Sequence, residues 1–225
     1  MYSGSRNIED LIASGYTVDI GKYLRRGWEI LKQNLGIYIG ITLLLFVFFA
    51  ALNLLPERLR GLSSLASIVI TGPIYGGLYL VAFKTIKQRA SSFSDFFRGF
   101  NNFLPLFLVN LLTGILIGIG FALLIIPGLY LAVSYLFAIP FVVDRRFDFW
   151  EAMETSRKLI SKRWFGFFGF LIVLFLINMV GALLVGIGML VTAPLTTCAI
   201  AAAYEDIVGL SSNGMADEAV SDSMV

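Results

Sequence analysis

The amino-acid sequence predicts an all-α, polytopic membrane protein with six transmembrane helices, arranged as three hairpins that each follow a cytoplasmic amphipathic helix. Two observations lead to this fold class. Hydrophobic residues make up 58% of the 225-residue chain and charged residues only 14%, whereas soluble domains average about 25% charged residues. Several apolar stretches also exceed about 18 residues, the length that indicates a membrane-spanning helix.

Six apolar segments are predicted to span the membrane, at residues 36–55, 62–83, 103–125, 128–143, 165–188 and 191–208. Of the 17 arginine and lysine residues, all but Arg58 and Arg60 fall in the N-terminal region, in the 84–102 connection or in the 144–163 connection. Basic residues collect on the cytoplasmic side of membrane proteins. Both termini and both long connections are therefore expected to be cytoplasmic, which requires an even number of spans.

The apolar run 103–143 is the element on which this topology depends. Its 41 residues would make a helix about 60 Å long, roughly twice the thickness of the hydrocarbon core. Proline disfavours a continuing helix and glycine permits a turn, so the run is predicted to reverse at Pro127 and Gly128. Pro194 is predicted to mark a similar turn between the last two spans. A single span over 103–143 is rejected, because it would place the basic 144–163 connection on the outer side.

Three charged and aromatic segments precede the predicted pairs of spans. In 19–33 and in 147–163, apolar residues recur on one face at helical spacing while charged residues take the other, which is typical of an amphipathic helix lying in the membrane interface. In the segment between them, an aromatic face is predicted to oppose a polar face. The aromatic face consists of Phe93, Phe96, Phe97, Phe100 and Phe103, and the polar face of Asp95, Arg98, Asn101 and Asn102.

This order of surface helix and two spans occurs three times, which predicts repeat-like units at about 17–89, 90–146 and 147–210. The stretches "ILKQNLGIYIG" (30–40) and "LISKRWFGFFG" (159–169) align without gaps. Agreement of charge, glycine and proline positions favours a real repeat over similarity from shared hydrophobicity. Residues 1–16 are predicted to be an N-terminal cytoplasmic segment, 17–210 the membrane domain, and the acidic tail 211–225 disordered.

Five residues inside the predicted spans are candidates for helix packing or for polar contacts in the membrane: Asn110, Gly114, Gly118, Asn178 and Gly186. Gly114 and Gly118 have the small-xxx-small spacing that lets helix backbones approach closely. Packing within the monomer is favoured there over an oligomer or partner interface. Asn110 and Asn178 are expected to hydrogen-bond across helices, and lining a polar passage is the alternative.

Charged side chains are predicted to stay out of the middle of the membrane. Pumps and proton-coupled transporters need such groups for charge relay, so the sequence argues against these classes. The chain contains no histidine, and we find no phosphate-binding loop, zinc motif or nucleophile elbow. The carboxylates near 144–154 are interleaved with basic residues and are interpreted as a solvated face. We therefore predict no enzymatic activity, no metal or cofactor, and no nucleic-acid partner.

The basic clusters are instead suited to anionic lipid headgroups. Membrane lipids are the predicted partners of six of these residues: Arg25, Arg26, Arg145, Arg146, Lys162 and Arg163.

Three stretches carry a family resemblance: "IPGLYLAVSYLFAIPFVVD" (126–144), "WEAMETSRKLI" (150–160) and "AAAYEDI" (201–207). Together they resemble an uncharacterised family of bacterial integral membrane proteins, related to the membrane domain attached to some glycerophosphodiester phosphodiesterases. The resemblance implies a six-helix module in the bacterial cytoplasmic (inner) membrane. It does not imply phosphodiesterase activity, because the corresponding soluble domain has no counterpart in this sequence.

Two functional interpretations follow. The favoured one is a scaffold or accessory subunit that packs with lipids, with a membrane-protein partner or with a second copy of the chain. The alternative is a transporter or channel for an apolar or lipid-like solute. A lipid-modifying enzyme, a third class, would need catalytic groups that we do not find in the sequence.

Overall fold

The computed structural model of the protein describes residues 6–54, 56–183, 188–212 and 214–216. Across this part of the chain the regular structure is helical, in the order α1 (Ile8–Ser14), α2 (Ile20–Gln33), α3 (Leu35–Asn53), η1 (Glu57–Leu59), α4 (Arg60–Ile86), η2 (Phe93–Asn102), α5 (Phe103–Leu123), α6 (Ile125–Ser134), α7 (Ala138–Arg145), α8 (Phe149–Ser161), α9 (Trp164–Leu183) and α10 (Met189–Val208). The prediction of an all-α protein is confirmed.

Five helical segments within the described residues are long and apolar enough to cross a bilayer: Leu35–Asn53, Ser63–Ile86, Phe93–Leu123, Ile125–Arg145 and Trp164–Leu183. The protein is therefore membrane-embedded. The last predicted span forms a helix, α10, but it is less apolar than the other five because it carries threonines and, in its last turn, Glu205 and Asp206. Most of α10 from Pro194 onward is buried, and it packs against α2, α3, α4 and α9 at the centre of the molecule.

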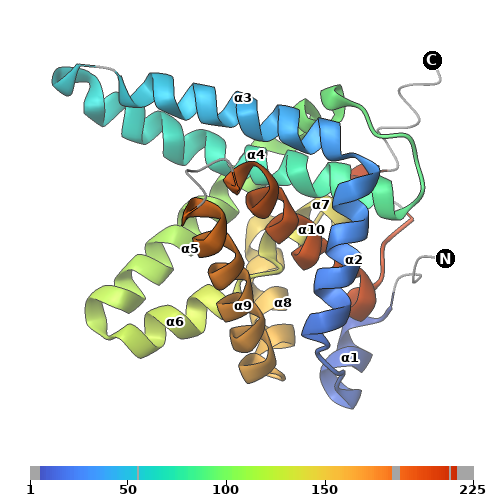
Figure 1. Cartoon of the computed structure of the whole chain (residues 1–225). Coiled ribbons are helices and arrows are strands. Elements are labelled where there is room, and N and C mark those ends of the chain that lie inside the picture. Colours follow the sequence, from blue (N-terminus) through green and yellow to red (C-terminus); the bar gives the residue numbers. More distant parts are fainter. Residues whose placement is uncertain (1–5, 55, 184–187, 213, 217–225) are drawn as a thin grey trace.

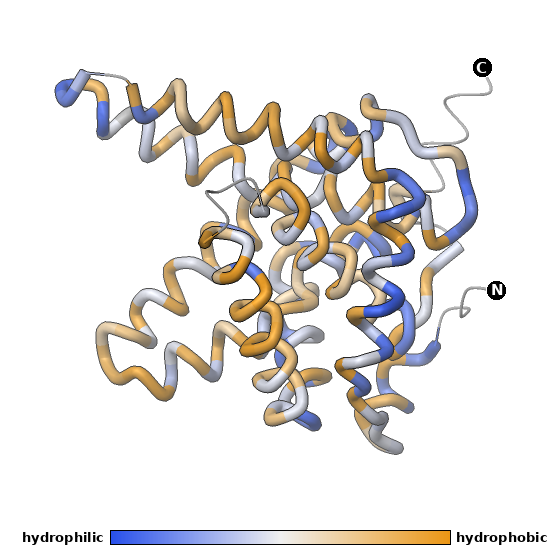
Figure 2. The backbone as a smooth tube through the Cα atoms, viewed as in Figure 1, coloured by the Kyte–Doolittle hydropathy of each residue, from blue (hydrophilic) through white to orange (hydrophobic). Residues whose placement is uncertain are grey.

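The helices extend from a common polar end of the molecule. In Figure 1, α3 and α4 run side by side away from the region where both termini lie, and α5 and α6 form a second pair beside them. Figure 2 shows hydrophilic residues gathered around α2 and near the termini, with a further group at the far tip of α3 and α4. That tip carries Glu57, Arg58 and Arg60.

The chain reverses between α5 and α6 three residues earlier than predicted. The reversal is at Leu124, which has an extended backbone (φ −160°, ψ 148°), while Pro127 lies in the first turn of α6. Proline is tolerated there because the first turn of a helix leaves its N–H groups without helical partners. Gly128 still shapes the hairpin, because a Cβ atom on Gly120 would lie 2.7 Å from its Cα.

Pro194 was also predicted to mark a turn, and this prediction is wrong. It lies inside α10, five residues after the helix begins at Met189. The close approach of α9 and α10 instead involves Gly181 and Gly188, where a Cβ atom on Gly188 would lie 2.5 Å from the Gly181 carbonyl oxygen. Small residues rather than proline therefore permit this hairpin.

The apolar faces predicted for 19–33 and 147–163 are the faces that the structure buries. In α2 the buried residues are Tyr23, Gly27, Ile30 and Leu31, and in α8 they are Ala152, Met153, Ser156, Leu159 and Ile160. These faces rest on protein: α2 packs mainly on α10, and α8 packs on α5, α6 and α7.

The aromatic face predicted for the segment before α5 is exposed except at Phe96, while one residue of the predicted polar face, Asp95, is buried. Residues 93–102 form a 3₁₀ helix, in which Asp95, Phe96 and Gly99 are buried, while Phe93, Phe97, Phe100 and the following Phe103 are exposed. The predicted separation of aromatic from polar residues therefore holds except at Asp95 and Phe96, which are both buried. Gly99 lets this helix approach α4, since a Cβ atom added to Gly99 would lie only 2.4 Å from the Pro73 carbonyl oxygen.

The start of the tail, predicted to be disordered from residue 211, packs against the protein. Met215 and Ala216 are buried, and a Cβ atom on Gly214 would lie 2.7 Å from the Asp144 carbonyl oxygen. Hydrogen bonds from the ends of α4 and α7 fix this segment, as described below. Residues 217–225 lie outside the described part of the chain.

Candidate functional site

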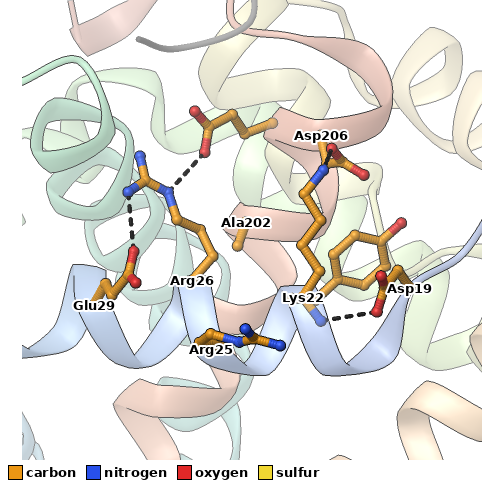
Figure 3. Close-up of a pocket in the computed structure, with 9 residues that line it drawn as sticks. Asp19, Lys22, Arg25, Arg26, Glu29, Ala202 and Asp206 are labelled. Atoms are coloured by element: carbon orange, nitrogen blue, oxygen red, sulfur yellow. Dashed lines mark hydrogen bonds and ion pairs between the residues drawn. The ribbon is translucent and has the colours of Figure 1, made fainter.

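A charged groove separates the exposed edge of α2 from α10, with a cavity volume of about 510 Å³. Figure 3 shows its side chains, which come from both helices. Lys22 pairs with Asp206, and Arg26 bridges Glu205 (Nε to Oε2, 3.5 Å) and Glu29 (Nη1 to Oε2, 3.3 Å). Five of the charged side chains in the groove are therefore paired with one another, and the pairs Lys22–Asp206 and Arg26–Glu205 hold α2 against α10.

The two helices can lie this close because of one small residue. A Cβ atom on Gly27 would lie 2.7 Å from the backbone of Ala199, which is shorter than real Cβ contacts. Next to it, Tyr23 is buried and stacks edge-on against Phe170, with ring centroids 5.6 Å apart. Burial raises the pKa of the Tyr23 hydroxyl to about 12, because the anion would lose its hydration.

A second polar cluster centres on Asp144 at the end of α7. Its buried carboxylate accepts hydrogen bonds from the Tyr204 hydroxyl (3.0 Å) and from the Ser211 backbone N–H (2.9 Å). The Nε of Arg145 lies 3.3 Å from it, and Lys87, at the end of α4, donates to the Ser211 carbonyl oxygen. The ends of α7 and α10 and the start of the tail are thus joined through one carboxylate, and the end of α4 is joined to them through Ser211.

A third polar feature is a buried ion pair that joins α4 to η2. Lys84 Nζ lies 2.8 Å from Asp95 Oδ2, and both side chains are almost fully buried. Asp95 also accepts from the Ser92 backbone N–H at 2.7 Å, closing a capping box at the start of η2. The buried ion pair holds Asp95 inside the protein beside Phe96, while the other phenylalanines of this segment are exposed.

A different kind of cavity lies among the apolar helices. About 560 Å³ in volume, it is bounded by α3, α4, α9 and α10 and is lined mostly by apolar side chains together with the Asn178 amide and several hydroxyl groups. Asn178 Nδ2 donates to the Leu174 carbonyl oxygen (2.9 Å) and to Thr196 Oγ1 (2.6 Å). This bond to Thr196 joins α9 to α10.

The other predicted packing residues have different surroundings. Asn110 Nδ2 donates across helices to the Ile68 carbonyl oxygen of α4, at 3.4 Å. Gly114 and Gly118 were expected to pack within the monomer, but they are exposed, and no heavy atom of the described residues would lie within 4 Å of a Cβ atom on either. That preference is wrong, because α4 contacts a different face of α5, through Gly72 and Gly76. Gly186 lies outside the described residues.

The six residues predicted to contact lipid divide into two groups. Arg26 and Arg145 are bound inside the protein: Arg26 to Glu29 and Glu205, and Arg145 to Asp144 and to the carbonyl oxygens of Arg6 and Val208. The other four are exposed: Arg25, Arg146, Lys162 and Arg163. Arg163 also donates to the Tyr16 carbonyl oxygen.

Comparison with protein-family models, with curated proteins and with solved structures finds no match for this chain. Its function is therefore inferred from its own residues.

Sequence reasoning missed the buried charges. Lys84, Asp95 and Asp144 were treated as solvated residues at the membrane boundary, but each is buried and bonded to a residue of another element. One local signal was present: Ser92 and Asp95 have the spacing of a capping box. For Asp144 the partners Tyr204 and Ser211 lie 60 and 67 positions away, and no local pattern indicates them.

Proposed function

We propose that this chain is a non-enzymatic integral membrane protein of six spans in a bacterial inner membrane, with both termini cytoplasmic, acting as a scaffold or accessory subunit. In this proposal α3–α4, α5 with α6–α7, and α9–α10 are three membrane hairpins. The helices α2, η2 and α8 precede them on the cytoplasmic side, as three repeat-like units.

Two contacts that basic side chains make with distant backbone carbonyl oxygens support this topology. Lys87 follows α4 and binds the carbonyl oxygen of Ser211, and Arg145 ends α7 and binds the carbonyl oxygen of Val208. The ends of α4, α7 and α10 therefore meet at one end of the molecule. Each pair of spans returns the chain to that end, as expected if all three basic clusters share a compartment.

The exposed glycine face of α5 carries the functional proposal. Gly114 and Gly118 lie one helical turn apart with no neighbouring atom of the described chain, and Ile115 and Ile119 beside them are half exposed. A glycine face exposes helix backbone, and in membranes close backbone approach is a main source of helix association. An α5 face of this kind is suited to another transmembrane helix, from a partner or from a second copy.

The test is substitution of this face by bulky residues. We expect Gly114→Leu with Gly118→Leu to abolish self-association or partner capture in native lipid discs, measured by native mass spectrometry. Gly36→Leu in α3 is the matched control, because a Cβ atom on Gly36 also meets no described atom within 4 Å. Unchanged assemblies in the double variant, or equal loss in the control, would show that the α5 face is not the interface.

The alternative, a transporter or channel for an apolar or lipid-like solute, is favoured by one observation, the cavity that reaches Asn178. If the protein transports such a solute, Asn178→Leu should reduce its flux in liposomes while leaving the protein folded. Asn110→Leu is the control and should keep its flux, because Asn110 bonds α5 to α4 and does not line this cavity. If flux is lost in Asn178→Leu and kept in Asn110→Leu, the transporter interpretation replaces the scaffold proposal.

A further inference from the structure

The cavity at Asn178 is lined by polar groups from all four surrounding helices. Three hydroxyl groups at this wall, those of Thr42, Thr71 and Thr196, donate their protons to carbonyl oxygens of their own helices, at 2.8, 2.6 and 3.0 Å. A hydroxyl that has donated its proton can only accept further hydrogen bonds. These threonines therefore present oxygen lone pairs and no protons.

Asn178 adds another acceptor. Its Nδ2 donates to the Leu174 carbonyl oxygen and to Thr196 Oγ1. Both partners must be acceptors, since a carbonyl carries no proton and the Thr196 proton is bonded to the Thr192 carbonyl oxygen. The amide orientation is thereby fixed, and both Nδ2 protons are used. Among the described contacts no donor reaches the amide oxygen, Oδ1.

The rest of the lining limits the ligand further. None of its residues is charged, and its larger side chains are apolar, including Leu45, Phe49, Ile74 and Leu78. Tyr75 and Thr197 also line it, and their hydroxyls can each accept or donate. Tyr75 and Met189 are both 44% exposed, so these two lining residues also form part of the outer surface of the helices.

We propose that this cavity binds a neutral, hydroxyl-bearing lipid, with its hydroxyl group at Asn178 and its hydrocarbon chain along Leu45 and Ile74. A hydroxyl supplies a proton to Asn178 Oδ1 or to the three threonine oxygens, which can only accept. A carboxylate or phosphate head would bring negative charge and more acceptors into an apolar site without a cation, which is costly. The volume lies within the usual range of about 300–1,000 Å³ for ligand cavities.

A neighbouring groove serves as an internal comparison. It has a volume of about 430 Å³ and is lined only by apolar side chains of α3, α4 and η2, including Phe97 and Phe100. It shares Leu45 and Ile74 with the first cavity. Hydrocarbon can enter either site, but only the cavity at Asn178 can select a head group.

The proposal is tested with two photoreactive probes of equal chain length, a long-chain primary alcohol and the corresponding carboxylic acid, added at neutral pH to the full-length protein in lipid discs. We expect the alcohol to label peptides of α9 and α10 around Asn178 several-fold more strongly than the acid. Labelling of η2 peptides should not distinguish the two probes. Equal labelling around Asn178 by alcohol and acid, or no labelling there, would overturn the proposal.

Two variants locate the selectivity. Asn178→Leu and Thr71→Val should each reduce alcohol labelling by about fivefold, the ratio that corresponds to one hydrogen bond in a membrane. Thr71→Val keeps the shape of the residue and removes only a hydroxyl bonded to its own helix, so it provides a test if Asn178→Leu does not fold. Asn110→Leu is the matched control and should label like the unmodified protein. Binding of the alcohol is independent of the scaffold proposal, because the labelling experiment measures neither assembly nor flux.

Discussion

The carboxylate of Asp144 in α7 and the hydroxyl of Tyr204 in α10 lie 3.0 Å apart, inside a cluster of aromatic rings. The ring of Tyr204 contacts Phe83, Phe137 and Phe141, with centroids 5.2–5.5 Å away. Tyr204 thus connects the aromatic core to the polar end of the molecule, where Asp144 also binds the segment after α10.

Removal of the Asp144 carboxylate should destabilise the protein strongly. Asp144→Ala leaves the Tyr204 hydroxyl and the Ser211 N–H without their acceptor and removes the partner of Arg145 Nε, and we expect a cost of about 3 kcal/mol or more. Tyr204→Phe removes one hydrogen bond and should cost about 1 kcal/mol. Thermal unfolding in mild detergent measures both. Asp10→Ala, at an exposed carboxylate of α1, is the control, and equal melting of Asp10→Ala and Asp144→Ala would contradict this account.

The buried pair of Lys84 and Asp95 should show strong coupling. Lys84→Met or Asp95→Leu alone leaves one charge buried without its partner, at an expected cost of about 3–5 kcal/mol. The double variant should cost less than the two single changes together. A double-mutant cycle on melting temperatures tests this. The pair Glu57 and Arg60, at 3.3 Å but with both side chains exposed, should show almost no coupling.

The glycines can be tested by matched substitutions to alanine. Gly27→Ala places a methyl group 2.7 Å from the Ala199 backbone and should cost about 1–3 kcal/mol through overpacking. Gly36→Ala meets no described atom within 4 Å and should be neutral or slightly stabilising, because alanine favours helix. If both variants unfold at the same temperature, the close approach of α2 and α10 is not as the structure has it.

The six-span topology can be tested by cysteine labelling in oriented vesicles. The natural Cys198 is buried, so it should remain unlabelled in the folded protein. We expect Ala90→Cys and Lys162→Cys to react with a membrane-impermeant reagent from one side, and Arg58→Cys only from the other. Opposite accessibility of positions 90 and 162 would show that α5, α6 and α7 do not return the chain to the side it started from.

Alkaline pH should weaken the contact of α2 with the core. Burial raises the pKa of Tyr23 from 10.0 to about 12, so the folded protein keeps this proton at a pH where the unfolded chain loses it. The stabilisation is complete below pH 10 and declines as the pH rises from about 10 to 12. Melting temperatures across this interval should fall less steeply for Tyr23→Phe than for the unmodified protein. If the melting temperatures of both proteins fall equally with pH, the loss of stability at alkaline pH comes from groups other than Tyr23.

Predictions from the sequence were most accurate where the deciding information is local. The helices lie close to the predicted apolar segments, because a run of apolar residues in a membrane must satisfy its own backbone hydrogen bonds. The buried faces of α2 and α8 follow from helical periodicity. The same method did not predict the burial of Asp95 in η2, because its ion pair with Lys84 depends on how η2 packs against α4. It also placed turns at Pro127 and Pro194, although proline is accommodated within both helices.

The sequence by itself determined that this chain is helical, that it is embedded in a membrane and where its main helices lie, since hydropathy and periodicity act over a few turns. Only the tertiary structure decided which charges are buried, which glycines lie at helix contacts and which are open, and how a cavity with an acceptor-rich wall forms at Asn178. Arg26 and Glu205 are separated by 179 positions, and Asn178 and Thr196 by 18. Contacts of this kind depend on how whole helices pack. A buried polar group such as Asp144 is stabilised by partners far away in the sequence, and no local pattern identifies those partners.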